Sequence, residues 1–133
     1  MTEVSRRIAW RNGGGWTRVL AQSDEQEPFT WRISRAEIER DGPFSNYSGY
    51  DRTIVSEDEP FTLEFIDGER VAVKALQPFS FDGEREVWCR LHGKAVTAFN
   101  VMTLRGACTH TVRIVDGEID VRIERRAPGT TTA

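Results

Sequence analysis

The sequence predicts an all-β fold of antiparallel strands, and three observations support this. Asp-Gly dipeptides, which favour two-residue hairpin turns, occur four times in the 133 residues. The segments between them alternate apolar and polar residues with the two-residue period of a half-buried strand. No segment shows the three- and four-residue apolar spacing of an amphipathic helix. Many short strands joined by tight turns are typical of an antiparallel sandwich or barrel.

The first third of the chain contains two irregular features. A short strand over Ile8–Trp10 leads into residues 12–15, which read Asn-Gly-Gly-Gly. Such a glycine run is either a tight turn or a backbone cradle for an anion, and the turn is the favoured interpretation. A P-loop is excluded because no Lys-Ser/Thr pair follows. The strand predicted over Trp31–Glu39 begins in alternation and then changes phase, which indicates a β-bulge within it.

Three later segments predict strands more plainly, two of them as hairpins. Phe61–Ile66 and Glu69–Lys74 flank one Asp-Gly turn, with apolar residues at alternate positions on both sides. Thr111–Val115 and Glu118–Glu124 flank another Asp-Gly turn in the same way. A single strand with the same alternation is expected over Val87–Leu91.

Composition limits the class of protein. The 18 basic and 21 acidic residues give a net charge of −3, which lacks the basic footprint of a nucleic-acid-binding protein. No apolar run exceeds three residues, so neither a membrane span nor a secretory signal is expected. Two cysteines are too few for a disulfide framework. We expect one cytoplasmic domain over residues 1–126, as a monomer or homodimer, and a disordered tail over residues 127–133.

Arg52 is the first candidate ligand-binding residue. A guanidinium fixed at the end of the turn-rich stretch 41–52 could bind a carboxylate through two parallel hydrogen bonds. The plain alternative is a surface ion pair between Asp51 and Arg52. Further polar contacts are expected from Asn12, Arg32, Ser34 and Asn100. An apolar wall is expected from Phe79, Phe81 and Met102, for which ordinary core packing is the alternative.

A metal site is the competing possibility. Both cysteines and both histidines of the chain are close in sequence, as Cys89, His92, Cys108 and His110, and such side chains bind zinc or iron. However, residues three apart in a strand point to opposite faces, so Cys89 and His92 diverge unless a turn intervenes. We therefore expect no metal and no cofactor. A metal held by His92, His110 and a cysteine is the enzymatic alternative.

Several segments resemble the HutD/Ves family, in family order over residues 8–123. They are Trp10-Arg11-Asn12-Gly13-Gly14-Gly15-x-Thr17, Trp31-Arg32-Ile33-Ser34-x-Ala36, Asp41-Gly42-Pro43-Phe44-Ser45, Gly49-Tyr50-Asp51-Arg52, Pro78-Phe79-Ser80-Phe81-x-Gly83 and Phe99-Asn100-Val101-Met102-Thr103-x-Arg105-Gly106. The resemblance implies a cupin-like β fold of the RmlC type. Because the chain is shorter than most members, it implies either one cupin half or a shortened double-cupin arrangement.

The same resemblance implies a regulatory function. HutD proteins accompany histidine-degradation genes, and the implied ligand is a small carboxylate metabolite such as formylglutamate, bound without a metal. Ves-like members are linked to stress response. We therefore expect a carboxylate-binding regulatory protein in histidine utilisation or stress response, with no nucleic-acid or membrane partner. A cupin-type enzyme, metal-dependent or isomerase-like, is the alternative, and a pure interaction module is a third class.

Overall fold

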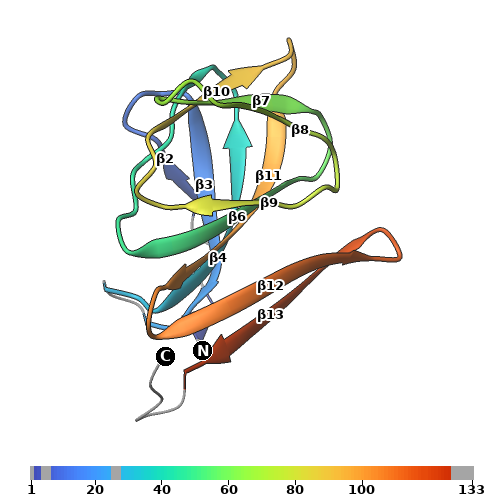
Figure 1. Ribbon diagram of the computed structural model, residues 1–133. Helices are drawn as coiled ribbons and strands as arrows, with labels where there is room; N and C mark the ends of the chain where they lie inside the picture. The colour runs from blue at the N-terminus through green and yellow to red at the C-terminus, as the bar shows by residue number, and fades with distance from the viewer. Residues whose placement is uncertain (1, 4–6, 25–27, 127–133) are drawn as a thin grey trace.

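The computed structural model describes residues 2–3, 7–24 and 28–126, so the tail expected over residues 127–133 lies outside the described residues. Every regular element in these residues is a strand (Figure 1), which confirms the all-β class. The largest sheet contains β1 (Thr2–Glu3), β2 (Arg7–Ala9), β3 (Gly15–Gln22), β4 (Trp31–Ile38), β6 (Tyr50–Ser56), β9 (Phe79–Asp82) and β11 (Val96–Leu104). A second sheet contains β5 (Gly42–Pro43), β7 (Phe61–Phe65), β8 (Arg70–Val73) and β10 (Val87–Leu91). A separate hairpin consists of β12 (Cys108–Val115) and β13 (Glu118–Arg125).

The two larger sheets face each other across the main core. The strand order is β1-β3-β4-β11-β6-β9 in the large sheet, with β2 beside β3, and β5-β10-β7-β8 in the smaller one. All of these pairings are antiparallel. Fully buried side chains come from both sheets, Ile54 and Ala98 from one and Phe61, Leu63 and Cys89 from the other. The sheets do not close into a barrel, so the architecture is a β-sandwich.

Both predicted hairpins form at their Asp-Gly turns. β7 pairs with β8 around residues 67–68, and β12 pairs with β13 around residues 116–117. In the second turn Asp116 and Gly117 both have positive φ, 50° and 77°, as a type I′ turn requires. The expected alternation in β10 is also present, with Val87 and Cys89 buried and Trp88 exposed.

The bulge predicted within β4 lies in its neighbour instead. β4 pairs with β11 without interruption along its whole length, whereas its register with β3 shifts between Val19 and Ala21. The apolar phase changes because β4 is covered on both faces. Ala36 and Ile38 join the main core, and Ile33 packs into a second cluster on the opposite face. Burial on both faces produces the same sequence pattern as a bulge, so the pattern alone could not separate them.

The β12–β13 hairpin covers the outer face of the large sheet, below the sandwich in the view of Figure 1. Phe99, Val101 and Val55 lie on this outer face and are buried. The hairpin packs four partly buried aliphatic residues against them: Val112, Ile114, Ile119 and Val121. The inner face of the same strands is therefore separated from the hairpin by the thickness of the sheet.

Candidate functional site

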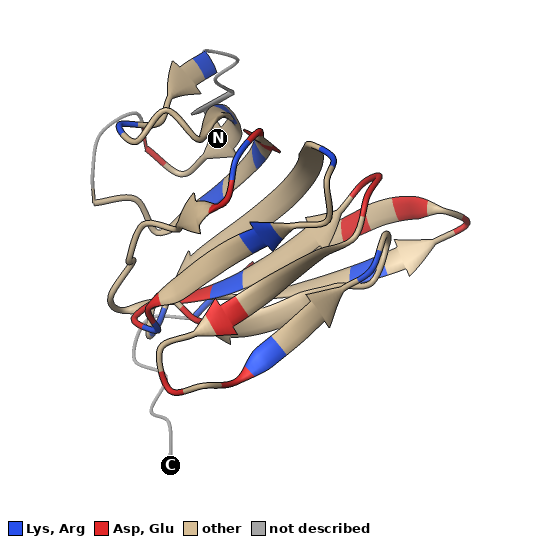
Figure 2. Ribbon diagram, turned by 90° about the horizontal axis from the view of Figure 1, so that it is seen from above, with Lys and Arg blue, Asp and Glu red and all other residues tan. Residues whose placement is uncertain are grey.

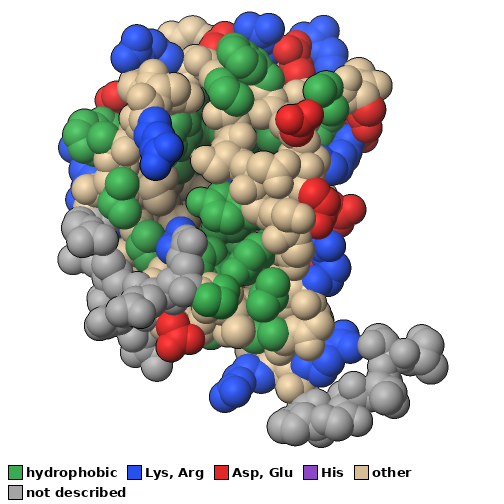
Figure 3. Space-filling model, turned by 90° about the vertical axis from the view of Figure 1, so that its left-hand side faces the viewer, with side chains coloured by type: hydrophobic (Ala, Val, Ile, Leu, Met, Phe, Trp, Pro, Cys, Tyr) green, Lys and Arg blue, Asp and Glu red, His purple; other side chains and the backbone are tan. Residues whose placement is uncertain are grey.

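A cavity of about 570 Å³ opens on the inner face of the large sheet. β3, β4, β6 and β11 form its floor, and β2 and residues 43–47 form its sides. This volume is typical of small-molecule sites, which span roughly 300–1,000 Å³. Figure 3 shows the molecule from the left-hand side of Figure 1, with hydrophobic side chains gathered in the middle of the view and basic side chains beside them.

The cavity carries charge of one sign. Of its described lining residues, three are arginines (Arg11, Arg32 and Arg52) and none is Asp or Glu. Elsewhere acidic and basic positions are interspersed along the strands (Figure 2), and many of them form ion pairs. The cavity is thus set apart from the rest of the surface by an excess of positive charge, which favours an anionic ligand.

Two adjacent rows of side chains across the large sheet contain seven of the eight predicted ligand-binding residues. Residues paired across neighbouring strands lie on the same face of a sheet. One row, read across β4, β11, β6 and β9, is Arg32, Met102, Arg52 and Phe81. The next row is Ser34, Asn100, Ile54 and Phe79. Strand register therefore brings together residues that are up to 70 positions apart.

Six of the eight predicted residues line the cavity, and the two on β9 do not. Arg52, Arg32, Ser34, Asn100 and Met102 line the cavity, as does Asn12 from the glycine turn. Phe79 and Phe81 do not line it. Their rings stack on each other with centroids 5.8 Å apart and pack in the core, so the core-packing alternative describes them better. Phe81 nevertheless contacts Arg52, because its ring centroid lies 4.9 Å from the Arg52 guanidinium carbon.

Arg52 lies on the cavity floor and is 7% exposed. Its Nη1 donates a hydrogen bond of 3.1 Å to the Ser45 carbonyl oxygen. Its Nε is buried and has no hydrogen-bond partner among the described residues. The Tyr47 and Phe44 rings also surround the guanidinium, 5.3 and 5.9 Å away. Burial lowers the pKa of Arg52 to about 10, so the group still carries its charge at neutral pH.

The surface ion pair considered for Asp51 and Arg52 does not form. Successive residues of β6 point to opposite faces, so Arg52 points inward while Asp51 pairs with Arg105 at 2.9 Å. None of the ion pairs in the described part of the chain includes Arg52. A buried charge without an opposite charge is costly. A carboxylate that entered the cavity would supply the missing partner with bidentate geometry.

Arg32, on the same row, is held by its neighbours. Its Nε donates a hydrogen bond of 2.9 Å to Gln22 Oε1, and its guanidinium lies 4.1 Å from the centre of the Phe29 ring. Phe29 is itself fixed, because its carbonyl oxygen accepts a hydrogen bond of 2.6 Å from the hydroxyl of Tyr50. A second guanidinium with a defined position therefore borders the cavity on the opposite side of Met102 from Arg52.

The glycine run is the tight turn between β2 and β3. The Asn12 side-chain oxygen accepts a hydrogen bond of 2.8 Å from the Gly14 amide, and Gly13 has a φ of 72°. A Cβ at Gly15 would collide with the Glu37 carbonyl oxygen, so only glycine fits against β4. The Gly14 amide is used within the turn itself, which favours the turn interpretation over an anion cradle.

Residues around Arg52 or at the cavity edge that the sequence does not single out as site residues include Trp10, Phe44, Ser45 and Tyr47. Trp10 donates a hydrogen bond of 2.7 Å to Thr17 and meets Phe44 edge to face. Ser45 acts through its carbonyl oxygen, so its side chain carries no signal in the sequence. Tyr47 lies in an irregular segment after β5, where no period indicates which side chains point inward.

The residues of the metal alternative are dispersed. Cys89 is fully buried in the core, where desolvation raises the pKa of its thiol to about 12. His92 bonds Thr62 at the exposed end of the smaller sheet. His110 lies on the outer face of the large sheet, bonded to Thr53 and Thr103. Within residues 2–3, 7–24 and 28–126, no three His, Cys, Asp or Glu side chains converge in a way that could hold a metal ion.

The comparisons with known proteins now identify the family. A family model described as HutD matches residues 2–130. The chain belongs to the HutD family. Among its curated relatives, the Ves protein of Escherichia fergusonii is 37% identical over 110 residues, covering 80% of this chain and 58% of that protein. An uncharacterised 21.2 kDa protein in the hutC 3′ region of Pseudomonas putida is 36% identical over 101 residues, covering 72% of this chain and 52% of that protein.

Solved structures with a similar fold include a family member and a cupin domain. HutD from Pseudomonas fluorescens, in a formate condition, gives a TM-score of 0.78 at 32% identity and covers 84% of this chain and 62% of that one. The cupin domain of an Enterobacter cloacae transcriptional regulator gives a TM-score of 0.57 at 15% identity, covering 68% of this chain and 96% of that one, which supports the cupin-like fold alone. The chain spans just over half the length of these two curated relatives. No helix in the described part of the chain is long and apolar enough to cross a membrane.

Proposed function

We propose that this HutD-family protein binds a small carboxylate metabolite in the cavity through Arg52, without a metal, and that occupancy of the site has a regulatory role. The observation that carries the proposal is the buried Arg52 guanidinium on the cavity floor, whose charge and Nε have no acidic or hydrogen-bond partner within residues 2–3, 7–24 and 28–126. A ligand carboxylate would provide the charge and the acceptor atoms that the protein leaves out.

The composition of the cavity supports binding over catalysis. Its described lining contains Arg, Asn, Ser, Thr and Tyr as polar types but no His, Asp, Glu, Cys or Lys. Isomerases and hydrolases that move protons use a side chain whose pKa lies near the working pH. Among the described lining residues the side chains most often used for this purpose are absent, so the isomerase-like alternative lacks the usual general base there.

The pathway is proposed from the relatives. One relative is named for the hutC region and another is named HutD, so histidine utilisation is the context we favour, with formylglutamate as the implied ligand. Stress response is the second context, because other relatives are named Ves.

A carboxylate panel tests the proposal on the purified chain. Formate, acetate, succinate, formylglutamate and urocanate are added to the wild type and to Arg52→Ala and Arg52→Lys, and thermal unfolding and calorimetric titration are measured. A ligand at 100 times its Kd should stabilise the wild type by about 2.7 kcal/mol, or several degrees in Tm.

Both Arg52 variants should lose this shift, because an ammonium group cannot reproduce the planar two-point contact. A wild type that responds to none of the compounds would argue for an interaction module instead, and an equal response of Arg52→Ala would remove Arg52 from the site.

A further inference from the structure

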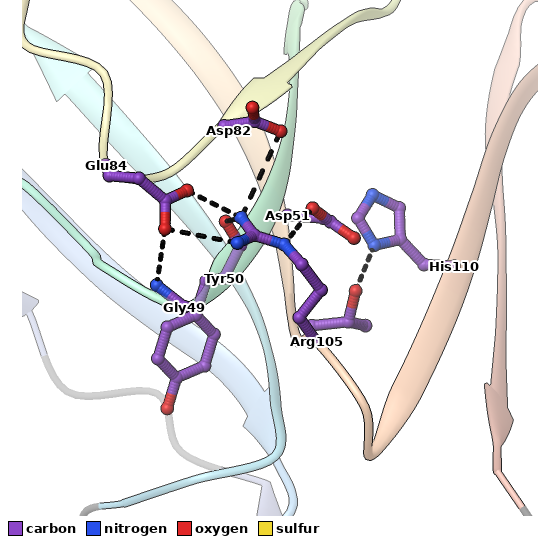
Figure 4. Close-up of polar contacts among 8 residues, drawn as sticks. Gly49, Tyr50, Asp51, Asp82, Glu84, Arg105 and His110 are labelled. Carbon is purple, nitrogen blue, oxygen red and sulfur yellow. Dashed lines mark hydrogen bonds and ion pairs between the residues drawn. The ribbon is translucent and has the colours of Figure 1, made fainter. Parts of the chain in front are cut away.

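An exposed cluster centred on Arg105 joins three segments at one corner of the sandwich (Figure 4). Arg105 follows β11, and its Nε donates to Asp51 Oδ1 at 2.9 Å. Its two Nη atoms donate to the Glu84 carboxylate at 2.6 and 3.1 Å, in a bidentate pair. Its Nη2 also donates to the Tyr50 carbonyl oxygen at 2.9 Å. These four hydrogen bonds direct the Arg105 guanidinium at the start of β6 and at the turn after β9.

Glu84 extends the cluster to the backbone before β6. Its carboxylate accepts a hydrogen bond of 2.9 Å from the Gly49 amide, and its carbonyl oxygen accepts one of 2.8 Å from the Asn46 side chain. The hydrogen bonds from Arg105 and then from Gly49 lower the pKa of Glu84 to about 2. The carboxylate is therefore ionised throughout the physiological range.

Backbone contacts complete the attachment of residues 46–50. The Tyr47 amide donates to the Gly83 carbonyl oxygen at 2.8 Å, and the Gly83 amide donates to the Tyr50 carbonyl oxygen at 2.7 Å. The Arg105 amide donates to the Gly49 carbonyl oxygen at 2.8 Å. A side chain at residue 83 would collide with the carbonyl oxygens of Tyr47 and Tyr50, so the turn can approach this closely only with glycine.

The attached segment is the one that shapes the surroundings of Arg52. The Ser45 carbonyl oxygen bonds Arg52 Nη1, and the Tyr47 ring lies 5.3 Å from the guanidinium carbon. Neither Glu84 nor Arg105 lines the cavity. The cluster can therefore act on the cavity only through the segments that it bonds, which are residues 46–50 and the start of β6.

We propose that Glu84 and Arg105 are positioning residues of the carboxylate site, which hold residues 45–50 against Arg52 so that the guanidinium is oriented before a ligand arrives. This inference rests on the proposed function, since it assigns a role in that same site. The side chains of Arg105 and Glu84 are 44% and 41% exposed, and exposed ion pairs contribute little to stability. Their contribution lies in preorganisation, which raises affinity by reducing the ordering that binding requires.

The test compares Glu84→Gln and Arg105→Gln with the wild type, and uses Glu57→Gln as the matched control. Glu57 forms a similar bidentate pair with Arg35, at 2.6 and 3.1 Å, and its described hydrogen bonds go to Arg35 and Thr97 rather than to residues 45–50. The first readout needs no ligand: the NMR signal of the buried Arg52 Nε–H and the hydrogen exchange of the Tyr47 amide. The second is the Kd for formylglutamate and for formate.

In both cluster variants we expect the Arg52 Nε–H signal to move, the Tyr47 amide to exchange roughly tenfold faster, and the Kd to rise roughly tenfold. The control should match the wild type, and all variants should keep the wild-type Tm within a few degrees. If the Arg52 Nε–H signal and the exchange rate of the Tyr47 amide are unchanged in the cluster variants, the positioning role is overturned, whether or not a carboxylate binds. Wild-type binding with an unchanged Kd in the cluster variants would overturn this inference alone, whereas a wild type that binds neither carboxylate would overturn the proposed function with it.

Discussion

The two faces of the β6–β11 strand pair differ in whether their buried polar side chains have hydrogen-bond partners. On the outer face, Thr53 and Thr103 bond the two ring nitrogens of His110 at 2.7 Å each, and the hairpin closes over them. On the inner face, the neighbouring residues Arg52 and Met102 border a cavity, and Arg52 keeps a buried Nε without a partner among the described residues. Thr53, whose hydroxyl is hydrogen-bonded, is thus the residue directly after Arg52, whose Nε has no partner among the described residues.

The difference shows how a binding site can be distinguished from a core on one sheet. A buried polar group that serves the fold has its hydrogen bonds completed by the protein. A buried cation whose partners are missing lowers the stability of the unliganded protein, and a ligand can recover that free energy. The outer face should therefore determine stability and the inner face should determine binding, which predicts different effects for substitutions on each.

The largest effect on stability is expected on the outer face. Phe99→Ala removes a ring that is packed under the hairpin against Val101, and it should lower the free energy of unfolding by about 3–5 kcal/mol. Denaturant titration measures the loss. The Kd for a carboxylate should stay near the wild-type value in the folded protein. A changed Kd with unchanged stability would reverse the assignment of the two faces.

His110→Ala should have the next largest effect. The substitution removes the ring nitrogen that Thr103 contacts at 2.7 Å and one of the two partners of Thr53, which keeps Ser80. This should cost about 1–3 kcal/mol of unfolding free energy. Hydrogen exchange should increase first in β12 and β13, because His110 makes polar contacts from the hairpin to two strands of the sheet. Uniform destabilisation of the whole sandwich, without early opening of the hairpin, would contradict this role.

Arg32→Gln sharpens the comparison on the inner face. The new side chain can still bond Gln22 but removes one of the positive charges that border the cavity. Stability should change by less than about 1 kcal/mol, and the Kd for a dicarboxylate such as succinate should rise about tenfold while the Kd for formate changes less. Equal weakening for both ligands would show that Arg32 does not contact the second carboxylate.

The pH dependence of stability should show the smallest effect. Burial lowers the pKa of His110 below its usual range, so protonation is easier in the unfolded chain, where the pKa is about 6.5. The contribution of neutral His110 to the free energy of unfolding is therefore complete above pH ~6.5. It is lost as the pH falls through the lower pKa that His110 has in the folded protein. Urea titrations between pH 7.5 and 5.5 should show a decline in the wild type that is smaller in His110→Gln. Identical declines would assign the effect to other groups.

Much of the fold was predictable from local sequence. The two-residue period and the Asp-Gly turns predict both hairpins, because each depends on residues that are close along the chain. The position of the bulge was not predictable. Ile33 packs against the same buried cluster as the distant β12–β13 hairpin, and a single strand contains no information about what buries its second face.

The candidate site was predictable in its residue types but not in its arrangement. The sequence indicates Arg52 by its guanidinium, and Arg32 and Met102 as further contacts. Their position on one row depends on a register that pairs residues 32 and 102, and residues 102 and 52. The same limit explains why Asp51 was paired with its neighbour rather than with Arg105, which follows β11.

The central claim is that Arg52 is kept for a ligand at a cost to stability, and unfolding of Arg52→Met tests it most directly. Methionine fills a similar volume without charge, so the unliganded variant should be as stable as the wild type or more stable, by up to about 1–4 kcal/mol in denaturant titration. The same variant should lose all stabilisation by carboxylates. A variant that is clearly less stable than the wild type, or that is still stabilised by carboxylates, would contradict the account.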